Sequence, residues 1–242
     1  MPRDLSDLPK NERYIIASDP TTPSYYLQLL TKDQDDGVRR CVADNSNTPV
    51  EFLIILSTDP AFYVRQAVAK NKNTPSKSLT ELANDHDSSV VWAVAGNPST
   101  PAKTLIQLAT HWDYHVKVAV AQNCHTPSSV LKTLAKNQKP STLACAVVQN
   151  KSTPTTLIQT VYQQAVLTDT LTEELAMAVV QSSLILSQTE YCALIASFGA
   201  NLADCIYYAV KYLPNSTLAN QLATYGFVPP FTKSTKTAFS VS

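Results

Sequence analysis

The sequence is poor in glycine, in charge and in long apolar runs. Only 4 of its 242 residues are glycine, and this scarcity favours helices over turn-rich β-structure. No apolar run reaches the about 18 residues that a membrane-spanning helix needs, so we expect no membrane partner. The chain has 19 basic and 19 acidic side chains. Because proteins that bind nucleic acid through its phosphates are usually basic, this balance argues against nucleic acid as the partner.

Cysteine is scarce as well. The chain has 5 cysteines, and an odd number without short spacings does not indicate a disulfide framework or a zinc site. The first residues hold no apolar stretch behind a basic start, so no secretory signal is expected. We therefore expect a reduced, cytoplasmic chain that holds no cofactor.

The motifs that usually carry catalysis are missing. We find no glycine-rich phosphate loop, no nucleophile elbow and no paired-carboxylate motif. His111 and His115 have the i, i+4 spacing of a zinc pair, but Trp112 stands where the zinc-protease pattern has Glu. The two histidines also flank a predicted loop, where helical spacing carries little meaning. We therefore predict no metal site, no catalytic residue and no enzymatic activity.

What the chain does have is an internal repeat. A Thr-Pro pair recurs every 26 residues, and once more after a spacing of 27. The prolines of these pairs are Pro23, Pro49, Pro75, Pro101, Pro127 and Pro154. An Asn stands four residues before each of the last five prolines. A fixed period of about 20–50 residues indicates a solenoid of stacked units.

The spacing within a unit predicts a first, short helix. Proline suits the first position of a helix, and the threonine before it, such as Thr74, can cap the free backbone N–H groups. Leucines follow four and seven residues after the proline, as Leu79 and Leu82 do after Pro75. This spacing draws one apolar stripe along a helix.

A polar break and a second helix complete each unit. Asp33, Asp59 and Asp85 recur in the break, and Asp59 with the following proline is interpreted as another helix start. The second helix carries a repeated valine, such as Val64, with small residues three positions on. We interpret the repeated Asn as the residue that ends this helix in a left-handed conformation, with a side chain able to bridge the turn into the next unit. Its role is therefore predicted to be structural.

These patterns predict an all-α, right-handed α-solenoid of two-helix repeats about 26 residues long, with a helical C-terminal cap. We expect an N-terminal cap or partial repeat over 1–19 and the repeat solenoid over 20–162. The C-terminal helical cap is expected over 163–225, and a flexible tail over 226–242.

The pattern Val-Arg-x-x-Val-Ala-x-Asn-x-x-Thr-Pro resembles that of the bacterial leucine-rich repeat variant, a helical relative of HEAT and armadillo repeats. Residues 64–71 followed by Thr74 and Pro75 are the best copy, and the resemblance covers about residues 20 to 155. It implies a curved superhelix that binds a partner and carries out no reaction. Some members of that family hold an iron–sulfur cluster, but this chain lacks the cysteine-rich segment, so that cofactor is not expected.

Positions that the repeat does not dictate are the candidates for function. On the second helices they lie one residue before and one, two and six residues after the repeated valine, and stacking aligns them into a stripe. The predicted partner-binding residues are Arg39, Arg40, Tyr63, Arg65, Gln66, Trp92, His115 and Lys117. Arg, Tyr and Trp often anchor protein interfaces, and they also suit a surface that binds nucleic acid. An ordinary solvated face with one exposed tryptophan is the alternative.

We therefore expect a non-catalytic scaffold that binds a protein or peptide. One alternative is a nucleic-acid-binding or base-repair protein of HEAT-like fold, which needs a basic stripe with a catalytic acid in it. A second alternative is a HEAT-like lyase or cofactor chaperone.

Overall fold

The computed structural model describes residues 5, 7–136, 142–182 and 186–198. In these residues all regular structure is helical, in fourteen helices, and none of those helices has the length and apolar character needed to cross a membrane. The chain divides into two compact units. Unit 1 holds the described residues up to 136 together with 150–152, and unit 2 holds 142–149 and the described residues from 153 onward.

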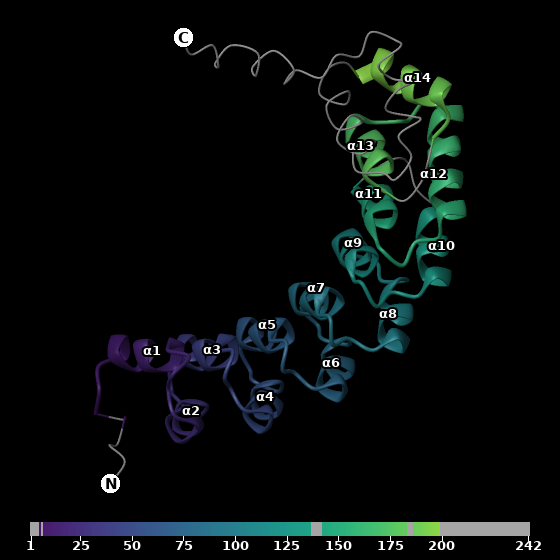
Figure 1. Ribbon diagram of the computed structural model, residues 1–242. Coiled ribbons are helices and arrows are strands. Elements are labelled where there is room, and N and C mark those ends of the chain that lie inside the picture. The colour runs from purple at the N-terminus through teal and green to yellow at the C-terminus, as the bar shows by residue number, and fades with distance from the viewer. Residues whose placement is uncertain (1–4, 6, 137–141, 183–185, 199–242) are drawn as a thin grey trace, which may run out of the picture. The chain divides into compact units, whose positions relative to one another are not determined.

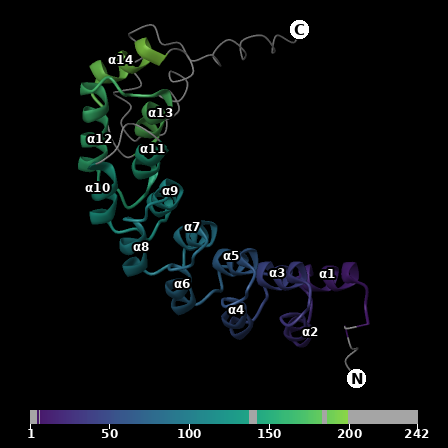
Figure 2. The same ribbon diagram turned by 180° about the vertical axis from the view of Figure 1, so that it is seen from behind.

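Unit 1 is built from five consecutive helix pairs. Its helices are α1 (Lys10–Ser18), α2 (Ser24–Leu30), α3 (Asp36–Asp44), α4 (Val50–Leu56), α5 (Phe62–Lys70), α6 (Ser76–Leu82), α7 (Ser88–Gly96), α8 (Ala102–Leu108), α9 (Tyr114–Gln122) and α10 (Ser128–Lys136). The odd-numbered helices form one row and the even-numbered helices another (Figures 1 and 2). Each odd-numbered helix packs on the next one in its row. The predicted all-α solenoid of two-helix repeats is confirmed.

The core of unit 1 lies between the two rows. The predicted leucine stripe of the even-numbered helices is buried throughout, at Leu27, Leu30, Leu53, Leu56, Leu79, Leu82, Leu105, Leu108, Leu131 and Leu134. From the other row the repeated valines are fully buried, at Val38, Val64, Val90 and Val116. Small residues such as Ala67 and Ala93 are buried between consecutive odd-numbered helices and let them approach closely. The repeat therefore encodes one continuous apolar layer.

The threonine of each Thr-Pro pair bonds to the helix before it, whereas the sequence predicted a cap on the helix after it. The proline lies just before the following helix and not at its first position. Pro75 has φ −67° and ψ 147°, so it precedes the helix as the N-cap residue and its carbonyl accepts from Leu79 N–H. The hydroxyl of Thr74 donates backward to the carbonyl of Val68, near the end of the preceding helix α5. A threonine hydroxyl can either donate or accept, and here it donates to a carbonyl of the last helical turn that also accepts from the backbone N–H of Asn71. The same bond recurs at Thr48, Thr100, Thr126 and Thr153.

The repeated asparagine links consecutive units. Asn71 is buried, and its Nδ2 donates to the carbonyl of Ala43 at 2.8 Å and to that of Asn45 at 3.0 Å, both in the preceding unit. Its Oδ1 accepts from the backbone N–H of Asn73 at 2.9 Å. Its backbone is extended, with φ −67° and ψ 126°, so the predicted left-handed conformation is wrong. The structural role is confirmed, although the bridge runs to the preceding unit instead of the next one.

The same two bonds are made by every repeated asparagine, at Asn45, Asn71, Asn97, Asn123 and Asn150. We call this set the asparagine ladder. In the first helix pair Asp19 occupies the asparagine position, and its carboxylate accepts from the backbone N–H and the hydroxyl of Thr21. A carboxylate donates nothing when ionised, so the ladder begins at Asn45.

Unit 2 contains α11 (Thr142–Gln149), α12 (Thr155–Leu167), α13 (Glu173–Gln181) and α14 (Gln188–Phe198). The first three pack on one another around buried apolar side chains that include Leu143, Ile158 and Val179. Asp169, two residues after the end of α12, has φ 51°, a left-handed conformation that Asp tolerates better than most residues. The predicted tail over 226–242 and the end of the predicted cap, from 199 on, lie outside the described residues.

Removal of one rung of the asparagine ladder should destabilise the stack. Asn71→Ala leaves two buried carbonyls and one N–H without their partner, which costs about 1–3 kcal/mol. Asn73→Ala is the matched control, because its side chain donates to Ser46 at the solvent-exposed surface. Urea unfolding measures both variants. Equal stability of the Asn71 variant and the wild type would contradict the structural role of the ladder.

The leucine stripe gives a second stability prediction. Leu79 is fully buried, so Leu79→Ala should lower the free energy of unfolding by about 2–5 kcal/mol through lost burial and the cavity left behind. Ile106→Ala, on the exposed side of α8, should cost much less, because Ile106 is half exposed. Thermal and chemical unfolding compare the two variants. A loss below about 0.5 kcal/mol at Leu79 would mean that the stripe is misplaced.

Candidate functional site

All eight predicted partner-binding residues lie on odd-numbered helices of unit 1, from α3 to α9. The structure separates them into two groups by their position after the repeated valine. One group follows the valine directly, at Arg39, Arg65 and Lys117, and is half-buried. The other group lies one residue before or two residues after it; Arg40, Trp92 and His115 are exposed, and Tyr63 and Gln66 are half-buried.

The two arginines of the first group are held by aspartates. Arg65 donates from Nε to Asp85 Oδ2 at 2.6 Å and from Nη2 to Asp85 Oδ1 at 2.9 Å. Its Nη1 donates to the carbonyl of Asp59 at 2.7 Å. The side chains are only 17% and 7% exposed. A two-pronged pair of this kind, shielded from water, fixes both side chains in place.

The same arrangement recurs in the two units before it. Arg39 pairs with Asp59, and Arg13 pairs with Asp33, each through Nε and Nη2. We call these three pairs the arginine clamps. Each clamp joins a helix of the odd-numbered row to the break that follows the next even-numbered helix, 20 residues along the chain. The recurring aspartates are therefore clamp partners, and Asp59 is not the helix start that its neighbouring proline suggested.

The clamps stop after Arg65. At the next equivalent positions stand Val91, which is buried, and His111, whose Nδ1 accepts from the backbone N–H of Asp113 at 3.1 Å. Lys117 follows in the same register and is half-buried. Arg13 was not singled out from the sequence, although its spacing of 20 residues to Asp33 is the same as in the other two clamps.

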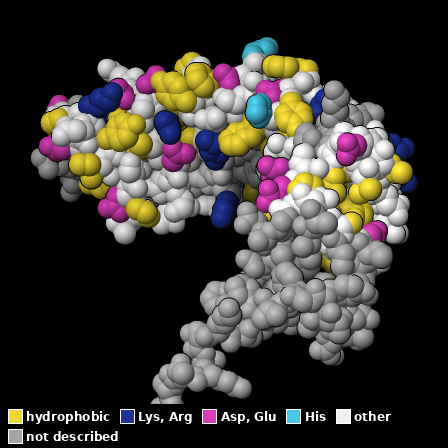
Figure 3. Space-filling model, turned by 90° about the horizontal axis from the view of Figure 1, so that it is seen from above, with side chains coloured by type: hydrophobic (Ala, Val, Ile, Leu, Met, Phe, Trp, Pro, Cys, Tyr) yellow, Lys and Arg dark blue, Asp and Glu magenta, His cyan; other side chains and the backbone are white. Residues whose placement is uncertain are grey.

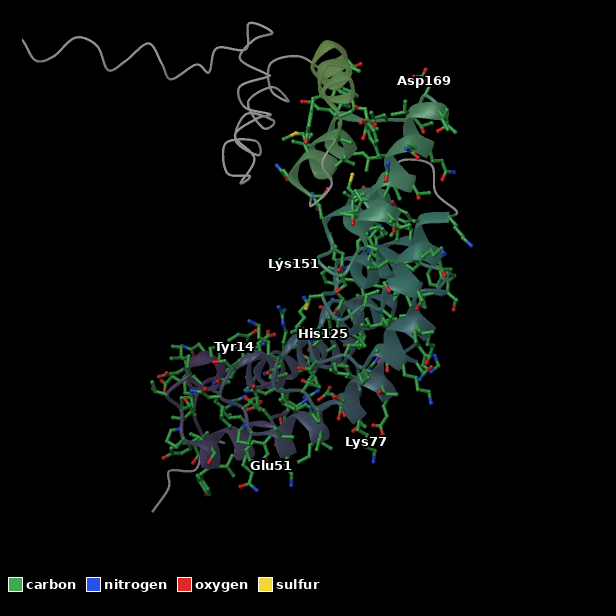
Figure 4. All side chains as sticks on the ribbon, turned by 45° about the vertical axis from the view of Figure 1, so that its right-hand side comes forward. Tyr14, Glu51, Lys77, His125, Lys151 and Asp169 are labelled. Atoms are coloured by element: carbon green, nitrogen blue, oxygen red, sulfur yellow. The ribbon has the colours of Figure 1, made fainter. Side chains whose placement is uncertain are left out.

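The second group belongs to a line of positions across the odd-numbered helices that are exposed or half-buried, except for Val118, which is buried. We call it the surface row and define it by three positions per helix, namely Gly37, Arg40 and Asp44 on α3, Tyr63, Gln66 and Lys70 on α5, Ser89, Trp92 and Gly96 on α7, and His115, Val118 and Gln122 on α9. The three positions share one helix face because they are three and four residues apart. Tyr14 of α1 continues the line (Figure 4), and the labelled Glu51 and Lys77 lie on the opposite side of unit 1.

Neighbouring helices contact one another along the surface row. The Nζ of Lys70 lies 5.7 Å from the centroid of the Trp92 ring, a cation–π contact between α5 and α7. Gln66 donates to the carbonyl of Ser89 at 3.4 Å. Arg40 pairs with Asp44 at 3.3 Å on the solvent-exposed side of α3. Trp92 remains 44% exposed, so the row brings a large aromatic surface into solvent.

The surface row carries no large area of one charge. Hydrophobic, basic, acidic and histidine side chains are interspersed on the face of unit 1 seen in Figure 3. Within the described residues, no group of three or more His, Cys, Asp or Glu side chains could hold a metal ion. The most exposed aromatic residue, Trp112, lies in the loop before α9, where its ring contacts that of His111.

Comparison with solved structures finds a matching fold. The chain resembles the solved structure of a leucine-rich repeat variant with a novel repetitive protein structural motif, at 23% identity and a TM-score of 0.52. The chain has the fold of a leucine-rich repeat variant. The match covers 72% of this chain and 66% of the other, so the chain matches just under two thirds of that structure's length. No protein-family model and no curated protein matches the sequence.

The repeated features of unit 1 and its surface row have different positions in the fold. The ladder, the leucine stripe and the clamps all maintain the stack of units. The surface row lies outside the ladder and the clamps, and apart from the buried Val118 its residues are exposed or half-buried.

The clamps should make stability depend on pH. Burial alone raises the pKa of the Asp85 carboxyl, but hydrogen bonds from Arg65 and the Asp87 N–H, with the attraction of the guanidinium, outweigh it and lower the pKa below its ordinary 3.8. A carboxyl with a lowered pKa stabilises the fold above its unfolded-state pKa of about 3.9, and this stability is lost as the pH falls through the folded-state value.

Asp85→Asn should therefore lose about 1–3 kcal/mol at pH 7, because the charge-assisted bonds to Arg65 weaken. The difference from the wild type should shrink as the pH falls below about 4. Urea unfolding at several pH values measures it. Asp44→Asn removes the exposed pair with Arg40 and should cost less than about 1 kcal/mol. A pH-independent difference at Asp85 would contradict the role of the clamp.

Proposed function

We propose that unit 1 is a non-catalytic scaffold and that its surface row binds a protein or peptide partner. The observation that carries this proposal is the exposed ring of Trp92 at the middle of the row. Tryptophan is a costly residue to expose, and it is among the most frequent anchors of protein interfaces. Tyr63 on one side and His115 on the other extend the same line.

The hydrogen bonds of the fold support this assignment. In the described residues every buried side-chain nitrogen or oxygen has a hydrogen-bond partner, so the fold leaves no buried polar group that a partner would have to satisfy. Of the predicted residues, Arg39 and Arg65 have their guanidinium groups occupied by the clamps. We therefore place the main contacts at Arg40, Tyr63 and Trp92, with Gln66, His115 and Lys117 around them.

Capture with matched variants tests the proposal. The full chain, a row variant (Tyr63→Ala, Gln66→Ala, Trp92→Ala) and an opposite-side variant (Val50→Ala, Ile54→Ala, Ile106→Ala) are immobilised and exposed to extract from the source cells. We expect a protein that the wild type and the opposite-side variant retain and the row variant loses. With that protein purified, Trp92→Ala should weaken binding by about 2 kcal/mol or more and leave the melting temperature nearly unchanged.

Two outcomes would contradict the proposal. Equal retention by the row variant would place recognition elsewhere on the chain. Recovery of nucleic acid, with retention that falls steeply as salt is added, would favour the nucleic-acid alternative, because counterion release drives that kind of binding.

A further inference from the structure

Three of the four helices that define the surface row carry no acidic residue. Helices α5, α7 and α9 contain no Asp or Glu, although the chain as a whole has equal numbers of acidic and basic residues. Their basic residues are Arg65, Lys70 and Lys117. Arg65 is neutralised by Asp85 in its clamp. Among the described residues no carboxylate forms an ion pair with Lys70, so its ammonium group is a cation without a counter-charge.

Gly96 is the second unusual feature of this region. It ends α7 with no left-handed backbone angle, so its conformation does not call for glycine. A Cβ atom built at Gly96 would meet nothing within 4 Å, so close packing does not call for glycine either. Glycine is among the weakest helix formers, and the equivalent positions of the row hold Asp44, Lys70 and Gln122.

Gly96 leaves open space beside an exposed aromatic ring. Trp92 lies one helical turn before it, on the same face of α7. The ammonium of Lys70 lies over the Trp92 ring, 5.7 Å from its centroid. Together the exposed Trp92 ring, the Lys70 ammonium over it and the position without a side chain at Gly96 form a small surface site. We call it the Trp92 notch.

We propose that the Trp92 notch receives an acidic peptide segment with one apolar anchor side chain. The anchor packs against Trp92 in the space above Gly96, and a neighbouring Asp or Glu pairs with Lys70. This inference rests on the proposed function and specifies the chemistry of its partner. Charge complementarity favours an acidic residue beside the anchor, because Lys70 has no ion-pair partner among the described residues and α5, α7 and α9 contain no Asp or Glu. A nucleic-acid strand is disfavoured, since its phosphates call for several unpaired cations in a line, and Lys70 lies beside uncharged Trp92 and Gly96.

A displayed library of random 12-residue peptides, selected on the full chain, tests the proposal. We expect enrichment of peptides that carry Asp or Glu next to Leu, Phe or Trp. Synthetic copies are then titrated against variants by fluorescence anisotropy. Trp92→Ala should weaken binding at least tenfold. Trp112→Ala, which removes the other exposed tryptophan, should leave it unchanged.

Gly96→Leu is the sharpest variant, because it fills the notch without removing any contact of the fold. Leucine is the better helix former, so the melting temperature should stay the same or rise while peptide affinity falls at least tenfold. Lys70→Glu should weaken binding at least fivefold, and Lys77→Glu on α6, on the opposite side of unit 1, should have no effect.

The outcomes separate this inference from the proposed function. Enriched peptides without acidic residues would contradict the proposal for the Trp92 notch. So would acidic peptides whose affinity is unchanged by Gly96→Leu and Lys70→Glu. Either result would still agree with a peptide-binding scaffold. Enrichment of no peptide would overturn both. Binding of a 20-residue oligothymidine that Lys70→Glu abolishes would overturn both in favour of nucleic acid.

Discussion

The structure of unit 1 depends on one side-chain amide repeated along the stack. Each buried asparagine donates two hydrogen bonds to carbonyls of the unit before it and accepts one from its own turn, as Asn71 does. A buried amide has a high cost when any of these partners is missing. Units can therefore stack in only one register. The leucine stripe supplies the apolar burial, and the asparagine ladder determines how consecutive units align.

Periodicity predicted the parts of the fold that repeat, and failed where one residue type has two uses. The leucines and valines were placed correctly, because their spacing allows only one buried face. Thr74 was assigned to the wrong helix, since a hydroxyl can cap the helix after it or the helix before it and the sequence does not distinguish the two. The arginine clamps were missed because Arg65 and Asp85 are 20 residues apart and meet only once the units are stacked.

The sequence predicted where the surface row runs along the helices, but not which of the candidate residues are exposed. Register alone predicted Arg40, Tyr63, Gln66 and Trp92 on one face, and in the structure Arg40 and Trp92 are exposed while Tyr63 and Gln66 are half-buried. The same register included Arg39 and Arg65, whose exposure depends on a partner that no local pattern reveals. The opening beside Trp92 was likewise hidden, since a glycine at the end of a helix is ordinary until its backbone angles and surroundings are known.

The asparagine ladder also makes the helix pairs interchangeable during evolution. Every rung joins the same side-chain group to the same two backbone carbonyls, so an internal unit of 26 residues can be duplicated or deleted and each new neighbour still finds its partner. The core is then preserved while the surface row gains or loses one helix. Recognition in such a chain can change by recombination of whole units, without any step that first weakens the fold.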